Sequence, residues 1–148
     1  IAAEKGAQIE AADLSEPSAA RLPELFEIAE SISAGRASAA LAQISRSTGA
    51  GREPVEILAV EVIPVMRRMM IAAAMLAARK GTGEIAGSLG LSPMSALATR
   101  AIDGAKKFGL ARLERAYHRA AELDQGFKNG QIKDREGALS ALVLELTA

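Results

Sequence analysis

The sequence has no cysteine and no tryptophan, and it contains only one tyrosine, three phenylalanines and one histidine. Without cysteine, the chain can form neither a disulfide bond nor a thiolate metal site. A single histidine also leaves little material for a zinc site. The β-branched and aromatic residues that favour strands are too sparse for a sheet of several strands. The composition, rich in alanine and leucine, therefore favours helices that pack closely through small side chains.

An excess of charge of one sign is also absent. The chain carries 18 basic and 18 acidic side chains, so its formal net charge is zero. Proteins that bind nucleic acid by electrostatic attraction usually have a basic excess. The net charge thus gives no indication of nucleic-acid binding, although it does not exclude a local basic patch.

The sequence shows neither a signal-peptide pattern nor an uninterrupted membrane span. Its longest apolar stretch, residues 57–78, is broken by Glu61, Arg67 and Arg68. Each charge near the centre of a bilayer would cost about 2.5–3.5 kcal/mol, which favours a buried helix instead. We therefore expect a cytoplasmic protein without a membrane partner. The absence of an initiator methionine at Ile1 is typical of a fragment.

Hydrophobic periodicity predicts an all-α domain over residues 21–148, a bundle of about six or seven helices. Residues 1–20 show little pattern, and we interpret them as a connector or the end of a preceding domain. The predicted helices span residues 22–35, 37–47, 54–80, 84–89, 92–108, 110–128 and 134–146.

The longest predicted helix, residues 54–80, has a proline in its first turn and is apolar nearly all round between residues 57 and 66. This pattern predicts a central helix. Pro64 removes one backbone hydrogen bond, so we expect a kink there. Four methionines on this helix are expected in the core, with an inter-subunit surface as the alternative: Met66, Met69, Met70 and Met75.

Features of an enzyme are missing from the sequence. There is no G-x-x-x-x-G-K-[ST] phosphate loop, and Gly49 and Gly51 are interpreted as a plain turn. His118 lies among charged residues on the polar side of its helix, which indicates a solvated face rather than a general base. We expect no catalytic residue, cofactor or metal ligand. A small helical enzyme or lyase-like domain remains open and would require a pocket with convergent titratable groups.

Residues 84–93 have the look of a helix-turn-helix, with a short helix, a glycine turn and a second helix that opens at Ser92 and Pro93. A helix that reads bases needs Arg, Asn or Gln near its beginning, and this helix has none there. We therefore expect no sequence-specific binding of nucleic acid and a packed helix instead. Its apolar side chains are expected to be buried: Met94, Leu97, Ala101 and Phe108. The DNA-binding domain of a transcription regulator is the alternative, and a basic face around residues 92–107 would favour it.

Asp124 is unusual because a helix over residues 110–128 places it in the middle of an apolar face. Lys128 follows at i+4, the favoured order for an ion pair on a helix. A local ion pair is the prediction, and a role in holding a neighbouring subunit is the alternative. The closing helix has more apolar residues than one stripe needs, which predicts an interaction surface: Leu139, Leu142, Val143, Leu144 and Leu146.

Several stretches occur in the order found in one known family. They are LFEIAESISAGRASAAL (25–41), GREPVEILAVEVIPVMRRM (51–69), EIAGSLGLSP (84–93), AKKFGLARLERAYHRAAELDQGFKNG (105–130) and ALSALVLEL (138–146). The series resembles the C-terminal domain of the delta subunit of bacterial DNA polymerase III, and Asp124 and Lys128 match the family's Asp-to-Lys spacing. Gly109, where many members have a Ser or Thr cap, and the Gln125-Gly126 pair depart from the pattern.

The resemblance implies that this chain is the collar domain of a clamp-loader subunit, part of the machinery that loads the sliding clamp during DNA replication. Its partners would be the gamma/tau ATPase subunits and delta prime, and the sliding clamp would be bound only by the N-terminal domain of the delta subunit. Delta subunits do not hydrolyse ATP, so neither catalysis nor a cofactor is implied. Without its partners, the fragment is expected to self-associate through its exposed apolar faces.

Overall fold

The computed structural model describes residues 26–148, and within this range the regular elements are all helices. In chain order they are α2 (Glu27–Ser33), α3 (Ala37–Gly49), α4 (Pro54–Ile57), η1 (Leu58–Val62), α5 (Ile63–Ala77), α6 (Thr82–Ser88), α7 (Ala96–Phe108), α8 (Leu110–Lys128) and α9 (Arg135–Thr147). Because α4, η1 and α5 follow one another without a break, the described part is a bundle of seven helices. This confirms the predicted fold class. The predicted connector, residues 1–20, lies outside the described residues.

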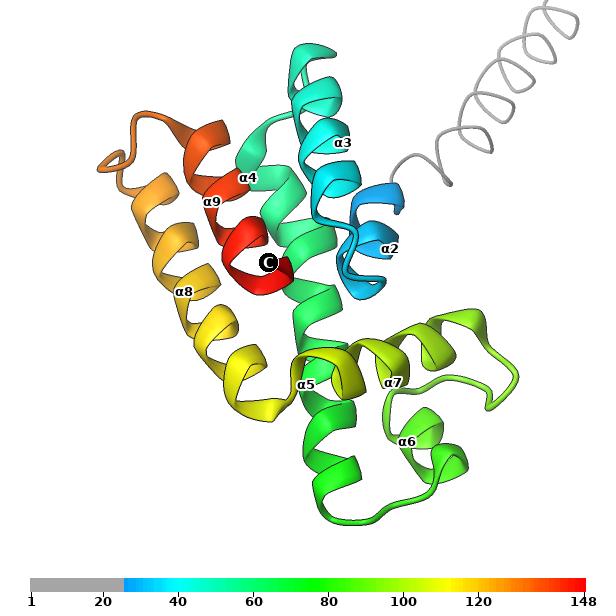
Figure 1. Cartoon of the computed structure of the whole chain (residues 1–148). Coiled ribbons are helices and arrows are strands. Elements are labelled where there is room, and N and C mark those ends of the chain that lie inside the picture. Colours follow the sequence, from blue (N-terminus) through cyan, green and yellow to red (C-terminus); the bar gives the residue numbers. More distant parts are fainter. Residues whose placement is uncertain (1–25) are drawn as a thin grey trace, which may run out of the picture.

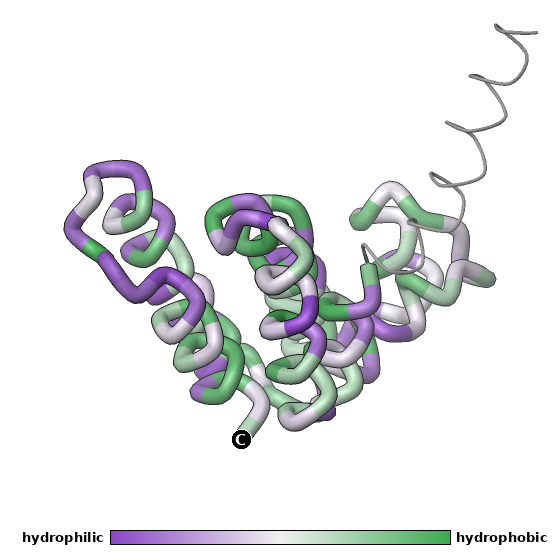
Figure 2. Tube along the Cα trace, turned by 90° about the horizontal axis from the view of Figure 1, so that it is seen from above, coloured by the Kyte–Doolittle hydropathy of each residue, from purple (hydrophilic) through white to green (hydrophobic). Residues whose placement is uncertain are grey.

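The continuous rod of α4, η1 and α5 lies at the centre of the bundle (Figure 1). The middle of the rod contacts α2, while α5 packs against α7 and α8, and α7 runs across it (Figure 1). The closing helix α9 packs between α3 and α8. Each helix carries both hydrophobic and hydrophilic positions, as amphipathic helices around one core do (Figure 2). None of the described helices is long and apolar enough to cross a membrane.

The rod is interrupted by a π-helical turn at Leu58–Val62, directly before Pro64. A proline in an α-helix lacks an amide hydrogen, and its ring clashes with the carbonyl four residues earlier. The wider π turn relieves this clash, so the expected disturbance at Pro64 takes the form of a π segment. The α-helix then ends at Ala77, three residues earlier than predicted, and Arg79 adopts a positive φ of 59°.

The core is built mainly from aliphatic side chains of the rod and of the helices around it. Met66 and Met69 are fully buried in it, and Met70 and Met75 pack against it with partial exposure. The large side chains that are completely enclosed include Ile28, Ile32, Ile44, Ile57, Leu58, Leu113, Leu139 and Leu146. Burying one such side chain is worth about 1.5–3 kcal/mol relative to leaving it in water. The methionines therefore serve the core, as predicted.

The beginning of α7 differs from the prediction. Ser95, not Ser92, caps the helix, and its Oγ accepts a hydrogen bond from the Leu97 amide at 3.2 Å. Met94 consequently lies in the preceding loop and is 92% exposed, and Leu97 in the first turn is 43% exposed. The predicted burial of these two residues is wrong, because the late start of the helix leaves them at the edge of the bundle. Ala101 and Phe108, farther along the helix, are buried as predicted.

Candidate interaction surface

The closing helix α9 is fixed at its beginning by Asp134, whose Oδ1 accepts a hydrogen bond from the Gly137 amide at 2.9 Å. This is the predicted cap. Four of the five apolar residues singled out on this helix are at most 2% exposed and belong to the core of the domain itself: Leu139, Leu142, Val143 and Leu146. Leu144 differs from them because it is 45% exposed. The apolar residues of α9 thus divide into four that hold the helix in place and one that faces outward.

An open groove of about 360 Å³ runs between α8 and α9. Its apolar lining comes from both helices and from the loop between them: Leu123, Ile132, Ala138, Ala141 and Leu142. Three charged side chains, Arg119, Glu122 and Glu145, form the remainder of the lining. Arg119 pairs with Glu122 at 3.6 Å and with Glu145 at 3.8 Å, so its guanidinium bridges the two helices. An apolar floor with paired charges at its edge is the usual composition of a protein–protein interface.

The loop between α8 and α9 completes the groove because Gly126 lets it fold back onto α8. The Ile132 amide donates a hydrogen bond to the Gly126 carbonyl at 3.3 Å. A Cβ atom at position 126 would lie 2.8 Å from Cγ1 of Ile132, which is too close for an ordinary contact. Gly126, a departure from the family pattern in the sequence, therefore allows this close approach, and a larger residue would require the Ile132 side chain to move.

Asp124 and Lys128 lie on α8 but do not line the groove. Lys128 Nζ donates to Asp124 Oδ2 at 2.7 Å, so the predicted local ion pair is present. The aspartate side chain is 22% exposed and the lysine side chain 65% exposed. A pair with so much contact with water contributes at most about 1 kcal/mol.

Glu61 is the important polar residue that the sequence patterns did not reveal. It is only 1% exposed, in the π turn at the centre of the rod. Its Oε1 accepts a hydrogen bond from the Ala29 amide at 3.2 Å, and its Oε2 pairs with Nη1 of Arg52. Burial raises the pKa of Glu61, while the bonds from Arg52 and from the Ala29 amide act in the opposite direction.

The contacts of Glu61 join three separate segments. Ala29 belongs to the first turn of α2, where amide groups have no partner within the helix. Arg52 belongs to the turn between α3 and α4. A carboxylate from the rod therefore caps α2 and anchors this turn at once. The signal in the sequence was a lone carboxylate within a stretch that is otherwise apolar all round.

Two of the three basic residues of α7, Arg100 and Lys107, bond within the domain. Arg100 pairs with Glu30 at 3.0 Å, and Lys107 Nζ donates to the Ala34 carbonyl at 2.8 Å. The buried side of α7 packs on α5 and α2. This arrangement gives no support to a helix that projects into a DNA groove. The described residues also contain no group of three or more His, Asp or Glu side chains placed to hold a metal ion.

The described residues thus define a class: an all-α bundle with an open apolar groove along its C-terminal helix pair. The model of the family described as DNA polymerase III delta subunit, C-terminal domain, matches residues 23–146. The chain belongs to this family, as the resemblance in the sequence implied.

Among solved structures, the chain is similar to the Bacillus subtilis DNA clamp loader delta protein, with a TM-score of 0.68 and 22% sequence identity. The similarity covers 84% of this chain and 35% of the Bacillus chain, so the chain spans about a third of that protein. At this identity the likeness establishes the shared fold. No curated protein sequence gives a significant match.

Proposed function

We propose that this chain is a collar domain, which joins a delta subunit to the gamma/tau ATPase subunits and delta prime of a bacterial clamp loader. Membership of the delta C-terminal family and the fold shared with a clamp loader delta protein support this role. The observation that carries the proposal is the α8–α9 groove beside the exposed Leu144, a surface suited to a neighbouring helix.

The groove has the features that a specific contact requires. Its apolar lining would be removed from water by a partner, and each Å² of apolar surface buried contributes about 25 cal/mol. Arg119, Glu122 and Glu145 would set the position of the partner through complementary charges. Leu144 lies on the outer side of α9 and enlarges the contact beyond the groove.

The proposed role is one of assembly and includes no chemical step. In this proposal ATP is bound and hydrolysed by the neighbouring subunits, and the sliding clamp is bound by other parts of the delta subunit. A complex that acts on the bacterial chromosome would place the chain in the cytoplasm.

The proposal is tested by a charge on the outer side of α9. Leu144→Glu should prevent co-elution of the chain with the ATPase subunits and delta prime of the same genome, because an unpaired carboxylate in an apolar contact is costly. Circular dichroism should be unchanged, since Leu144 is 45% exposed.

Met94→Glu is the matched control, because Met94 is an exposed apolar residue far from α9 in the sequence and 92% accessible. This variant should assemble like the unmodified chain. Normal assembly of Leu144→Glu would contradict the proposed surface.

A further inference from the structure

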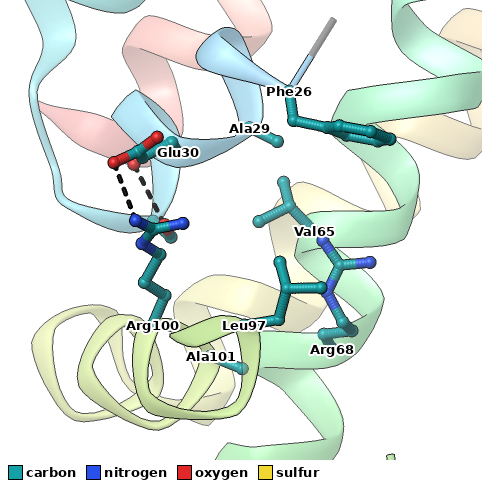
Figure 3. A pocket seen from close by; sticks show the side chains of 9 residues that line it. Phe26, Ala29, Glu30, Val65, Arg68, Leu97, Arg100 and Ala101 are labelled. Carbon is teal, nitrogen blue, oxygen red and sulfur yellow. Dashed lines mark hydrogen bonds and ion pairs between the residues drawn. The ribbon is translucent and has the colours of Figure 1, made fainter. Parts of the chain in front are cut away.

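The helices around the central rod of α4, η1 and α5 leave one stripe of it open. On the covered part, Val65 is 4% exposed and lies between α2 and α7, where Arg100 pairs with Glu30 at 3.0 Å (Figure 3). The open stripe runs along the rod, and its side chains are exposed or half-buried. We call it the rod seam, and it consists of Glu56, Val60, Ile63, Arg67, Met70, Ala74 and Ala77.

The rod seam has the spacing of a contact between two helices. Its residues follow one another at alternate intervals of four and three positions, as the a and d residues of a heptad do. All of them are apolar except Glu56 and Arg67, which enclose Val60 and Ile63. Val60 is 44% exposed, so no helix of the described residues covers this apolar centre. An apolar stripe that is open to water and has heptad spacing indicates that another helix packs on it.

The two charges of the rod seam indicate which helix this is. The Arg67 guanidinium is held by Tyr117, whose Oη accepts hydrogen bonds from Nε at 3.3 Å and from Nη2 at 3.1 Å. Among residues 26–148 no carboxylate pairs with Arg67, and Nη1 is left for a partner. Glu56 pairs with Arg52 at 3.4 Å and keeps a side chain that is 51% exposed. Glu56 and Arg67 lie about 16 Å apart along the rod, so they complement each other only across two copies of the chain.

We propose that the rod seam packs antiparallel on the rod seam of a second copy of this chain, with Glu56 of each copy paired to Arg67 of the other and Val60 packed on Ile63. Such a contact is two-fold symmetric, so one patch serves both copies. A parallel pair would place Glu56 opposite Glu56 and Arg67 opposite Arg67, which is repulsive. Of the antiparallel registers that keep heptad positions opposite each other, this one alone places a carboxylate of the seam opposite Arg67. The seam shares no residue with the α8–α9 groove, so the two surfaces are tested independently.

The pairing is tested by charge reversal in the chain of residues 1–148. Analytical ultracentrifugation should show a reversible monomer–dimer equilibrium. Glu56→Arg and Arg67→Glu should each raise the dimer dissociation constant about ten-fold or more, because like charges then meet at two symmetric places. The double variant should return to within about three-fold of the unmodified chain. Lys106→Glu, at an exposed lysine of α7, is the control and should dimerise normally. A chain that is monomeric at every concentration, single reversals without effect, or a double variant as weak as the single ones would overturn the proposal.

The register is tested separately with single thiols, since the chain has no cysteine. In a mixture of Val60→Cys and Ile63→Cys chains, oxidation should join one chain of each kind by a disulfide bond faster than it joins two chains of the same kind. Mass spectrometry distinguishes these products, and a mixture that yields only like pairs would contradict the register. If the Val60→Cys chain stays monomeric and its thiol is protected from alkylation only after the ATPase subunits are added, the seam belongs to a neighbouring subunit and the proposal is refuted as well.

Discussion

At the scale of single residues, Glu61 shows how one polar group connects parts of a chain that are far apart in sequence. Its carboxylate bonds the Ala29 amide and Arg52, whose side chain is only 12% exposed. Both partners are needed, since a buried charge without partners is strongly unfavourable. The sequence showed the carboxylate in an apolar stretch, but it could not show the partners, because they come from segments 9 and 32 residues away.

The stability of the domain should depend on pH through Glu61. Burial raises its pKa above the ordinary value of 4.5, so in the interval above 4.5 the folded chain binds more protons than the unfolded chain. The contribution of Glu61 to the free energy of unfolding is therefore present at low pH and lost as the pH rises through the folded-state pKa. The Glu61→Gln variant has no carboxyl group at this position, so its free energy of unfolding should not show this decrease as the pH rises. Urea unfolding at a series of pH values measures the difference, and identical pH profiles for both chains would refute the assignment.

Removing the partly buried cation of Arg52 should destabilise the domain more than removing an exposed cation. Arg52→Met leaves the buried carboxylate without its charged partner and should cost about 3–5 kcal/mol. The double variant Arg52→Met with Glu61→Gln removes the charge but keeps an oxygen for the Ala29 amide, so it should recover most of this loss. Arg46→Ala is the control, because Arg46 pairs with Glu27 at 3.4 Å with a side chain 69% exposed. Chemical denaturation gives the values, and equal losses for Arg52→Met and Arg46→Ala would exclude the buried pair.

At the scale of helices, the sequence predicted the ends best where a cap or a turn glycine stands directly at the boundary. The bounds of α8, Leu110–Lys128, match the prediction, and Asp134 caps α9 as expected. Gly35 ends the α2 segment with a φ of 72°. The predicted start of α7 was wrong because two serines, Ser92 and Ser95, offer similar caps. Local signals could not decide between them, because the hydroxyl of each serine accepts a hydrogen bond from the amide two residues later.

The packing of α7 on α5 depends on a glycine in the helix. A Cβ atom at Gly104 would lie 3.1 Å from Cγ of Met69 and 3.1 Å from the Ser33 carbonyl oxygen. Gly104→Ala should destabilise the domain by about 1–3 kcal/mol, because overpacking outweighs the gain in helix propensity.

Gly87 in α6 is a matched control for Gly104, since a Cβ atom added there would meet nothing within 4 Å. Gly87→Ala should therefore stabilise the domain by about 0.5–1 kcal/mol. Thermal unfolding of both variants measures the contrast. A Gly104→Ala variant as stable as Gly87→Ala would show that α7 does not approach α2 and α5 this closely.

At the scale of the whole molecule, composition and periodicity were sufficient for the fold class, because alanine- and leucine-rich amphipathic segments have few alternatives to a bundle. The candidate surface was only partly predictable. The sequence indicated a surplus of apolar residues on the last helix, yet Leu139, Leu142, Val143 and Leu146 turned out to fill the core. The groove depends on how α9 packs against α8, and that pairing is a tertiary contact without a local signal.

The most direct test of the assembly role uses the absence of cysteine. Ala141 lines the α8–α9 groove, and Ala141→Cys gives a chain with one thiol at that place. Alkylation of this thiol should be slowed strongly when the ATPase subunits and delta prime are added, whereas Met94→Cys should react at an unchanged rate. If Ala141→Cys reacts equally fast in the free chain and in an assembled complex, the groove is not the collar contact and the central claim is wrong.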